Sequence, residues 1–376
     1  RASAGVASSS HYASAHALRA SCRPARPSAM AWAAGRRARR CAWRVALAAC
    51  LLAALARWPC PAAFGSPRSF GSPPGLMVSP LRLVTFDLDD TLWPQAEVIE
   101  RANGAMAAAL QEAGAAAASA HDVMQRMRAI RRERTEAARA RGDAPYKISY
   151  SDLRRECIAA VLRDQAALSE AAATAATEPI FRRWVLARHA AAEELLFDGA
   201  AEAVAAVRKD HPRAVVGAIT NSVADPAAVP SLAAFFSFTA SGEDPGIFPH
   251  RKPSPVIFEV ALQRAAEFSP DVSRLRGSGR NSDGGGGWWV HVGDDLPNDV
   301  GAAAAAGALA VWITGAEEPG SGQAQASVPS FSSMTPEEAA AKGQASASAR
   351  DLAAASLASV VELPALLRTW AEAGVQ

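Results

Sequence analysis

The sequence predicts an α/β protein with a doubly wound parallel sheet and an inserted helical cap domain. Short apolar segments, partly β-branched, alternate with helical segments along much of the chain, and this alternation is typical of a parallel sheet with helices on both faces. Residues 96–197 interrupt the alternation with an alanine-rich stretch that contains few strand formers. That stretch predicts a separate helical bundle.

Five apolar segments are predicted as strands: 81–86, 214–219, 235–241, 288–295 and 308–314. Ser254 and Pro255 form an N-cap followed by a proline at the first helical position, which predicts a helix starting at Pro255. The cap bundle is expected to break within 141–152 and to restart after Ser151, a good N-cap. Residues 357–373 read as a strand or turn followed by a closing helix.

These elements give the expected domain organisation. Residues 77–94 and 198–376 form the α/β core, and residues 95–197 form the cap. Two segments of the core, 277–287 and 315–350, are rich in Gly, Ser and Ala and are expected to be flexible insertions. The chain of 376 residues is long enough for both domains and further segments. Its net charge of only +2 gives no reason to expect nucleic-acid binding.

Residues 1–76 are expected to be a disordered leader, because they are rich in Arg and contain no Asp or Glu. From Met30 onward, a basic run precedes the apolar run 45–56, which is the layout of a signal peptide and too short to span a bilayer. We therefore expect no stable membrane association of the mature protein. Cys157 is the one cysteine after this leader, which favours a reducing compartment.

Signal-like and acid-free segments that meet at an Ala-Phe junction, here at Phe64, resemble the bipartite leaders of complex plastids. The resemblance implies a plastid location. The secretory pathway and the cytoplasm stay open as alternatives.

Polar residues follow the predicted strands at their carboxyl ends, where ligands bind in open parallel sheets. We expect all of them to surround one crevice. They are Asp87, Asp89, Asp90 and Thr91 after the first strand, Thr220 and Asn221 after the second, Lys252 before a helix, and Asp294, Asp295 and Asp299 after the fourth.

These residue types fit phosphoryl transfer. A carboxylate can attack phosphorus, and a second acid two residues later can protonate the leaving oxygen and then activate water. Clustered carboxylates repel one another unless a cation compensates them, and an all-oxygen ligand set suits Mg²⁺. The hydroxyl of Thr220 and the cation of Lys252 can hold the phosphoryl oxygens.

The segments "FDLDDTL", "ITNS", "RKPSPVIFEVAL" and "VHVGDDLPNDVGAAAAAG" resemble, in order, the four motifs of the haloacid dehalogenase-like (HAD) hydrolase superfamily. The resemblance covers residues 81–314 and implies a Rossmann-like HAD core with a C1-type cap. It implies that Asp87 is the nucleophile and a Mg²⁺ ligand, and that Asp89 is the general acid/base and lends its backbone carbonyl to the metal. It further implies phosphoryl binding by Thr220, Asn221 and Lys252, metal ligation by Asp294, and support of the metal site by Asp299 and Asp295.

Within this superfamily the motifs are similar to those of phosphatases acting on 5-amino-6-(5-phosphoribitylamino)uracil and flavin mononucleotide (FMN). The resemblance implies a small phosphomonoester as substrate and a role in riboflavin metabolism. Alternatives are a phosphatase of another small metabolite, a sugar phosphomutase and a non-catalytic binding module. A dehalogenase needs neither the second acid nor a metal, so Asp89 and Asp294 favour phosphoryl transfer. His291 is interpreted as a core histidine bonded to backbone.

Overall fold

A computed structural model describes residues 80–143, 149–275, 287–315 and 336–373. All of them belong to the second of two units, Arg1–Pro74 and Gly75–Gln376. The predicted leader over 1–76 lies outside the described residues. So do residues 276–286 and 316–335, which cover most of one expected flexible insertion and part of the other.

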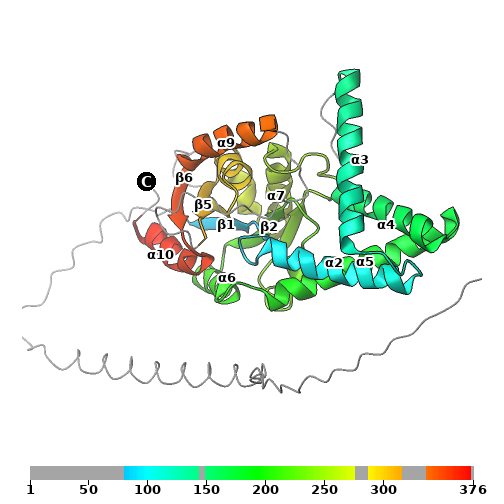
Figure 1. Ribbon diagram of the computed structural model, residues 1–376. Coiled ribbons are helices and arrows are strands. Elements are labelled where there is room, and N and C mark those ends of the chain that lie inside the picture. The colour runs from blue at the N-terminus through cyan, green and yellow to red at the C-terminus, as the bar shows by residue number, and fades with distance from the viewer. Residues whose placement is uncertain (1–79, 144–148, 276–286, 316–335, 374–376) are drawn as a thin grey trace, which may run out of the picture. The chain divides into compact units, whose positions relative to one another are not determined.

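A parallel sheet of six strands forms the core, in the order β3-β2-β1-β4-β5-β6 (Figure 1). All five ladders are parallel. The chain builds outward from β1 to β3 and then returns to build β4 to β6 on the other side. A crevice for ligands is expected beside β1, where the direction of building reverses. The strands are β1 (Leu81–Phe86), β2 (Val215–Thr220), β3 (Phe238–Ser241), β4 (Trp288–Gly293), β5 (Leu309–Ile313) and β6 (Ala353–Leu357).

Helices cover both faces of the sheet, which confirms the doubly wound fold. On one face, α6 (Ala200–Asp210) and α10 (Leu363–Ala373) pack against Val84 and Phe86. On the other, α7 (Pro255–Phe268) and α8 (Ala302–Ala305) pack around Leu83. Figure 1 shows α6 and α10 opposite α7. Short 3-10 helices cover Pro226–Ala228 (η1), Pro270–Leu275 (η2) and Val360–Glu362 (η4), and a π-helix covers Leu296–Gly301 (η3).

The cap lies between β1 and β2 in the sequence and consists of α2 (Gln95–Glu112), α3 (Ala120–Arg141), α4 (Tyr150–Ala166) and α5 (Glu170–Glu194). It has its own apolar cluster, which includes Met106, Met127 and Trp184. The predicted restart after Ser151 is wrong by two residues. The side chain of Ser149 accepts a hydrogen bond from the backbone of Asp152 at 3.1 Å, so Ser149 is the N-cap of α4.

Residues 315–350 are expected from the sequence to be a flexible insertion. This expectation is wrong for Pro336–Arg350, which form helix α9. This helix contacts η3, and Ala349 is buried there. Lys342 pairs with Asp295 at 2.7 Å, and the Arg350 guanidinium lies 4.9 Å from the centre of the Trp312 ring. The helix is composed mostly of small residues, and it is stabilised by close approach to a neighbouring element rather than by a strongly apolar face.

The five strands and the helix predicted for the core agree with the structure to within three residues, whereas the sixth strand, β6, lies at 353–357, before the predicted strand or turn that begins at Leu357. The helix at Pro255 begins at that residue with Ser254 as its N-cap. The third strand begins at Phe238, later than expected, because the backbone of Ser237 is the first to bond to β2. None of the described helices has both the length and the apolar character needed to cross a membrane.

Candidate active site

The turn after β1 separates the three carboxylates that the sequence places together. Asp87 continues the strand and donates its backbone N–H to the carbonyl of Val292 at 2.8 Å. Asp90 has a positive φ of 58° and accepts a hydrogen bond from the backbone of Gln95 at 2.9 Å, so it caps α2. Only Asp87 and Asp89 therefore turn into the crevice, and each meets its own cation.

Asp87 and Asp299 share the ammonium group of Lys252. The Nζ atom lies 2.7 Å from Asp87 Oδ1 and 2.6 Å from Asp299 Oδ1, and all three side chains are buried or nearly so. The side chain of Asn221 holds Lys252 in place: its Oδ1 accepts from the Lys252 backbone at 2.8 Å, and its Nδ2 donates to the Lys252 carbonyl at 3.0 Å. The second and third motifs thus support each other directly.

Asp87, Asp294 and Asp299 offer oxygen atoms that all lie within 4.8 Å of one another. Burial, strengthened by neighbouring carboxylates, raises the pKa of Asp87 to about 8 even though Lys252 opposes it, and it raises the pKa of Asp294 well above its usual range. Asp299 also loses hydration by burial, but Lys252 holds its pKa at about 2. Three carboxylates against one lysine leave negative charge uncompensated, so the oxygen set fits a divalent cation such as Mg²⁺.

Close approach of the backbone at Gly293 makes this triad possible. A Cβ atom at that position would lie 2.4 Å from Cγ of Asp299. The carboxylate of Asp299 is further fixed by the backbone N–H of Asp295, which donates to its Oδ2 at 3.0 Å. Asp295 itself turns outward to Lys342. The predicted residues of the fourth motif therefore divide, with Asp294 and Asp299 inside the cluster and Asp295 at its rim.

Asp89 is held by a cap residue that sequence reasoning missed. Arg188, on α5, donates from Nη2 to both oxygens of Asp89, at 2.7 and 2.6 Å. Trp93 Nε1 and Ser222 Oγ donate to the same carboxylate, each at 2.9 Å. Burial alone would raise the pKa of Asp89, but the charge and hydrogen bonds of Arg188 outweigh it and hold that pKa below its usual range.

Thr220 lies at the end of β2, almost fully buried. Its Oγ1 accepts a hydrogen bond from the backbone of Ser222 at 3.2 Å and lies 3.0 Å from the Ser222 hydroxyl. Ser222 thus links the side chain of Thr220 to Asp89.

Behind the triad, His291 is buried as expected, but its partners are side chains rather than backbone. Its Nδ1 lies 2.9 Å from Thr85 Oγ1, and its Nε2 lies 3.4 Å from Asp299 Oδ1. Trp289 Nε1 donates to the same Thr85 hydroxyl at 2.9 Å. Burial lowers the pKa of His291, so a neutral imidazole separates Thr85 from Asp299. The interpretation as a backbone-bonded histidine was wrong in its partners, because the parallel register places Thr85 opposite His291.

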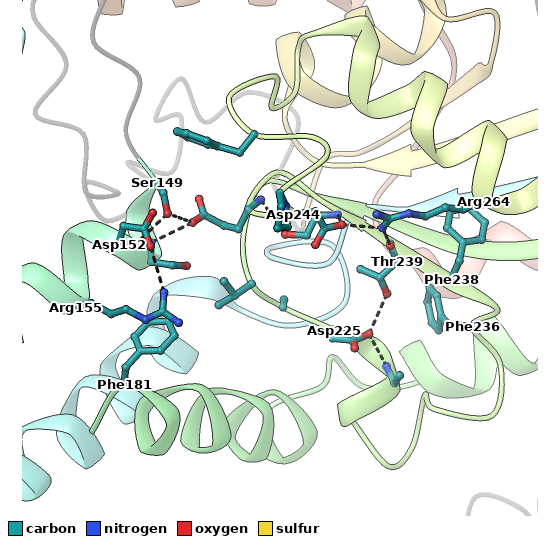
Figure 2. A pocket seen from close by; sticks show the side chains of 18 of the residues that line it. Ser149, Asp152, Arg155, Phe181, Asp225, Phe236, Phe238, Thr239, Asp244 and Arg264 are labelled. Carbon is teal, nitrogen blue, oxygen red and sulfur yellow. Dashed lines mark hydrogen bonds and ion pairs between the residues drawn. The ribbon is translucent and has the colours of Figure 1, made fainter. Parts of the chain in front are cut away.

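A cavity of 870 Å³ opens between cap and core, beside the loop that contains Asp225 (Figure 2). Arg155 and Phe181 line it from the cap, and Asp225 and Arg264 line it from the core. Glu243 also lines the cavity, and it accepts hydrogen bonds from Ser149 Oγ at 2.8 Å and from two backbone N–H groups in the first turn of α4. A core carboxylate therefore holds the positive end of a cap helix.

A sequence signal for Arg188 exists, although it is weak. Phe181, Trp184 and Arg188 follow one another at spacings of three and four, so they share a face of α5, and all three are buried. A charged residue on an otherwise apolar helix face needs a partner. The sequence cannot name that partner, because Asp89 lies 99 positions away.

This fold and site define a doubly wound α/β protein with an inserted helical cap and an acidic site at the carboxyl ends of its strands. The family model for "haloacid dehalogenase-like hydrolase" matches residues 81–307. The chain therefore belongs to the haloacid dehalogenase-like hydrolases. No curated protein matches the sequence.

Several solved structures are similar to this chain. A 2-haloacid dehalogenase from Pseudomonas syringae pv. Tomato DC3000 is 24% identical, with a TM-score of 0.50, over 77% of this chain and 99% of that one. A HAD phosphatase from Thermococcus onnurineus is 15% identical, with a TM-score of 0.37, over 76% and 98% of the two chains. A haloacid dehalogenase-like family hydrolase from Xanthomonas campestris is 18% identical, with a TM-score of 0.36, over 79% and 100%. The likeness concerns the fold alone.

Proposed function

We propose that this protein is a Mg²⁺-dependent phosphatase that hydrolyses a small phosphomonoester through an aspartyl-phosphate intermediate. The observation that carries the proposal is the contrast between two carboxylates only two residues apart. Asp87 lies in the acidic triad beside Lys252, whereas Asp89 is bound by Arg188, Trp93 and Ser222. Two acids in different environments suit two different roles.

In the first step, a carboxylate oxygen of Asp87 forms a bond to phosphorus while the bond from phosphorus to the ester oxygen breaks. Asp89 gives its proton to that ester oxygen, which leaves as an alcohol. In the second step, Asp89 takes a proton from water and the water oxygen bonds to phosphorus. The bond from phosphorus to Asp87 breaks, so inorganic phosphate leaves and the carboxylate of Asp87 is regenerated. The low pKa of Asp89 beside Arg188 favours the second step, so proton donation in the first requires that contact to loosen.

Asp87, Asp294 and the backbone carbonyl of Asp89 would hold Mg²⁺, with Asp299 and Asp295 supporting them. When bound, the metal supplies positive charge that stabilises the phosphoryl group as it is transferred. Thr220 Oγ1 and Lys252 Nζ would hold phosphoryl oxygens. Because the side-chain amide of Asn221 is engaged with Lys252, we assign phosphoryl contact at Asn221 to its backbone N–H.

The helical insertion after β1 supports assignment to the C1-capped branch of the family. The motif resemblance makes 5-amino-6-(5-phosphoribitylamino)uracil phosphate and FMN candidate substrates, with a role in riboflavin metabolism. A plastid location, inferred from the leader, would fit that pathway. These finer assignments rest on the sequence motifs, which surround the phosphoryl group rather than the leaving group.

The test is phosphate release from a panel of phosphomonoesters, with Mg²⁺ and with EDTA. The panel contains the two flavin-pathway compounds, nucleoside monophosphates, sugar phosphates and short phosphorylated acids. We expect release that requires Mg²⁺. Release concentrated on the flavin-pathway compounds would support riboflavin metabolism, and release spread elsewhere would remove that assignment but keep the chemistry. No release from any compound would favour a phosphomutase or a binding module.

The variant Asp87→Asn should lose phosphate release by at least about a thousandfold, because an amide is a poor nucleophile. Asp198→Asn is the matched control, since Asp198 lies in an exposed turn before α6. The control should keep the rate of the unmodified protein. Turnover retained by Asp87→Asn would refute the aspartyl-phosphate mechanism.

A further inference from the structure

We propose that the cap carries a binding site for a second oxyanion of the substrate, formed by Arg188 and Arg154 around the indole of Trp184. This inference rests on the proposed phosphatase function and narrows it. The preferred substrate would be a phosphomonoester whose leaving group bears its own carboxylate or phosphate, a few bonds from the ester oxygen.

Arg188 is the first part of the argument. Its side chain is only 4% exposed, and its contacts with Asp89 and Ser222 all leave from one nitrogen, Nη2. Its Nε is buried without a hydrogen-bond partner among the described residues. A guanidinium binds a single anion best with two parallel donors, so this contact leaves part of the arginine unused. A buried donor that has no partner in the protein is a natural contact for a ligand oxygen.

Arg154 is the second part. It comes from α4, is 4% exposed, and its guanidinium lies 3.7 Å from the centre of the Trp184 ring. The Arg188 guanidinium lies 5.8 Å from the same ring. Burial, together with the charge of Arg188, lowers the pKa of Arg154 to about 9. Two buried guanidinium groups therefore lie against one aromatic side chain, and their positive charges favour the approach of an oxyanion.

Trp184 is held firmly enough to serve as the centre of such a site. Its Nε1 donates to Asn103 Oδ1 at 2.9 Å. Phe181 stacks on it, with ring centres 5.9 Å apart, and Phe181 in turn lines the cavity between cap and core. Phe181 thus connects the arginine site to the wall of that cavity.

The position of Arg188 also limits the ligand. It touches Asp89, the residue to which we assign proton transfer at the leaving oxygen. An oxyanion bound at Arg188 would therefore lie near the ester oxygen, not at the far end of a long leaving group. Short phosphorylated acids and closely spaced bisphosphates fit this geometry. The ribityl chains of the flavin candidates carry hydroxyl groups there, so those compounds should rank lower in the panel.

A purely structural role is the alternative, in which Arg188 only anchors the cap to the core. Binding of phosphonates, which are not hydrolysed, separates the two. We would titrate the full chain by calorimetry at a fixed free Mg²⁺ concentration with ethylphosphonate, phosphonoacetate and ethane-1,2-diphosphonate. The last two ligands carry a second oxyanion, which is a carboxylate in phosphonoacetate and a phosphonate in ethane-1,2-diphosphonate. Comparing these two ligands shows which group the site prefers. We expect at least one to bind about tenfold more tightly than ethylphosphonate.

We define the preference as the dissociation constant of ethylphosphonate divided by that of the tighter-binding ligand with two oxyanions. In Arg188→Gln and in Arg154→Gln this ratio should fall to nearly one. Arg182→Gln is the matched control, because Arg182 is an exposed arginine on the same helix, and it should keep the preference. Thermal unfolding identifies a variant that fails to fold. If Arg188→Gln fails, Arg188→Lys replaces it, since lysine keeps the charge but loses the paired donors and should reduce the preference.

A preference near one in the unmodified protein, or one that survives in folded variants of both arginines, would overturn the inference. The outcome is independent of turnover. A protein that releases phosphate but shows no preference loses this inference alone. A protein that shows the preference but hydrolyses nothing loses the proposed function alone.

Discussion

Three aspartates within four residues show how position, not residue type, determines chemistry. Asp87 meets Lys252, Asp89 meets Arg188, and Asp90 turns away to cap α2. The repulsion expected from the sequence is thereby divided among separate partners. What remains is the crowding of Asp87 with Asp294 and Asp299, which a divalent cation would relieve.

That crowding predicts an unusual pH dependence in the metal-free protein. The pKa of Asp87 rises from 3.8 to about 8 on folding, so between these values the folded state holds a proton that the unfolded state has released. The free energy of unfolding contributed by this group must then fall as pH rises through that window. The lowered pKa of Asp299 acts below the window and does not oppose it.

The measurement is urea unfolding in EDTA from about pH 4 to about pH 8, for the unmodified protein and for Asp87→Asn. The difference between the two isolates Asp87 from other titrating groups. We expect the variant to gain stability relative to the unmodified protein as pH rises. A constant difference across the window would contradict the assignment.

At the scale of elements, the pairing of β2 with β3 depends on a residue without a side chain. A Cβ atom at Gly217 would lie 2.3 Å from the ring of Phe238, the residue paired with it across the ladder. The edge strand β3 therefore packs closely against β2 at this position. Since Thr220 ends β2, this packing also fixes the loop that carries the second motif.

Gly217→Ala should consequently lower the free energy of unfolding by about 1–3 kcal/mol, because the ring has to move to admit a methyl group. Gly246→Ala is the matched control, since a Cβ atom there meets nothing within 4 Å. Denaturant midpoints of the two variants measure the difference. Equal midpoints would show that the Phe238 ring gives way freely.

Helices α4 and α9 show where local sequence signals were insufficient. Ser149, Ser151 and Asp152 are all acceptable caps, and Glu243 decides among them by accepting hydrogen bonds from the first residues of α4. Residues 336–350 are small and polar, a composition that predicts flexibility, yet they pack on η3. Both elements depend on contacts with distant residues, and a sequence window cannot contain them.

At the scale of the whole molecule, the cap has an apolar cluster of its own, but Val98 of α2 and Ala191 of α5 belong to the apolar cluster of the core. Cap and core also meet at polar contacts. Arg188 with Asp89 is one such contact, and Glu243 with the start of α4 is another. Both lie beside the crevice or its cavity. Under the proposed function, substrate binding would be coupled to the fit of the cap through these side chains.

Mg²⁺ should stabilise the folded protein, because the triad exists only when strand ends distant in sequence are brought together. At a Mg²⁺ concentration about a hundred times the dissociation constant, the gain in unfolding free energy should be about 2.7 kcal/mol. Thermal unfolding with Mg²⁺ and with EDTA measures it. Asp294→Asn should lose most of the gain, and Asp295→Asn, at the rim, should keep most of it. Equal gains in both variants would place the metal elsewhere.

The sequence by itself determined the fold class, the alternation of strands and helices, and the residues at the strand ends. Those properties are local, because apolar periodicity and turn chemistry lie within short windows. The arrangement of Asp87, Thr220, Lys252 and Asp294 around one crevice followed from a single topological rule about parallel sheets.

Only the tertiary structure decided how those residues are paired. It brought Arg188 from the cap to Asp89, gave the side chain of Asn221 to the backbone of Lys252, and placed His291 beside Asp299. Each of these contacts joins residues that are far apart in the chain or on different elements. Their formation depends on the packing of cap on core and on strand register, which no local pattern encodes.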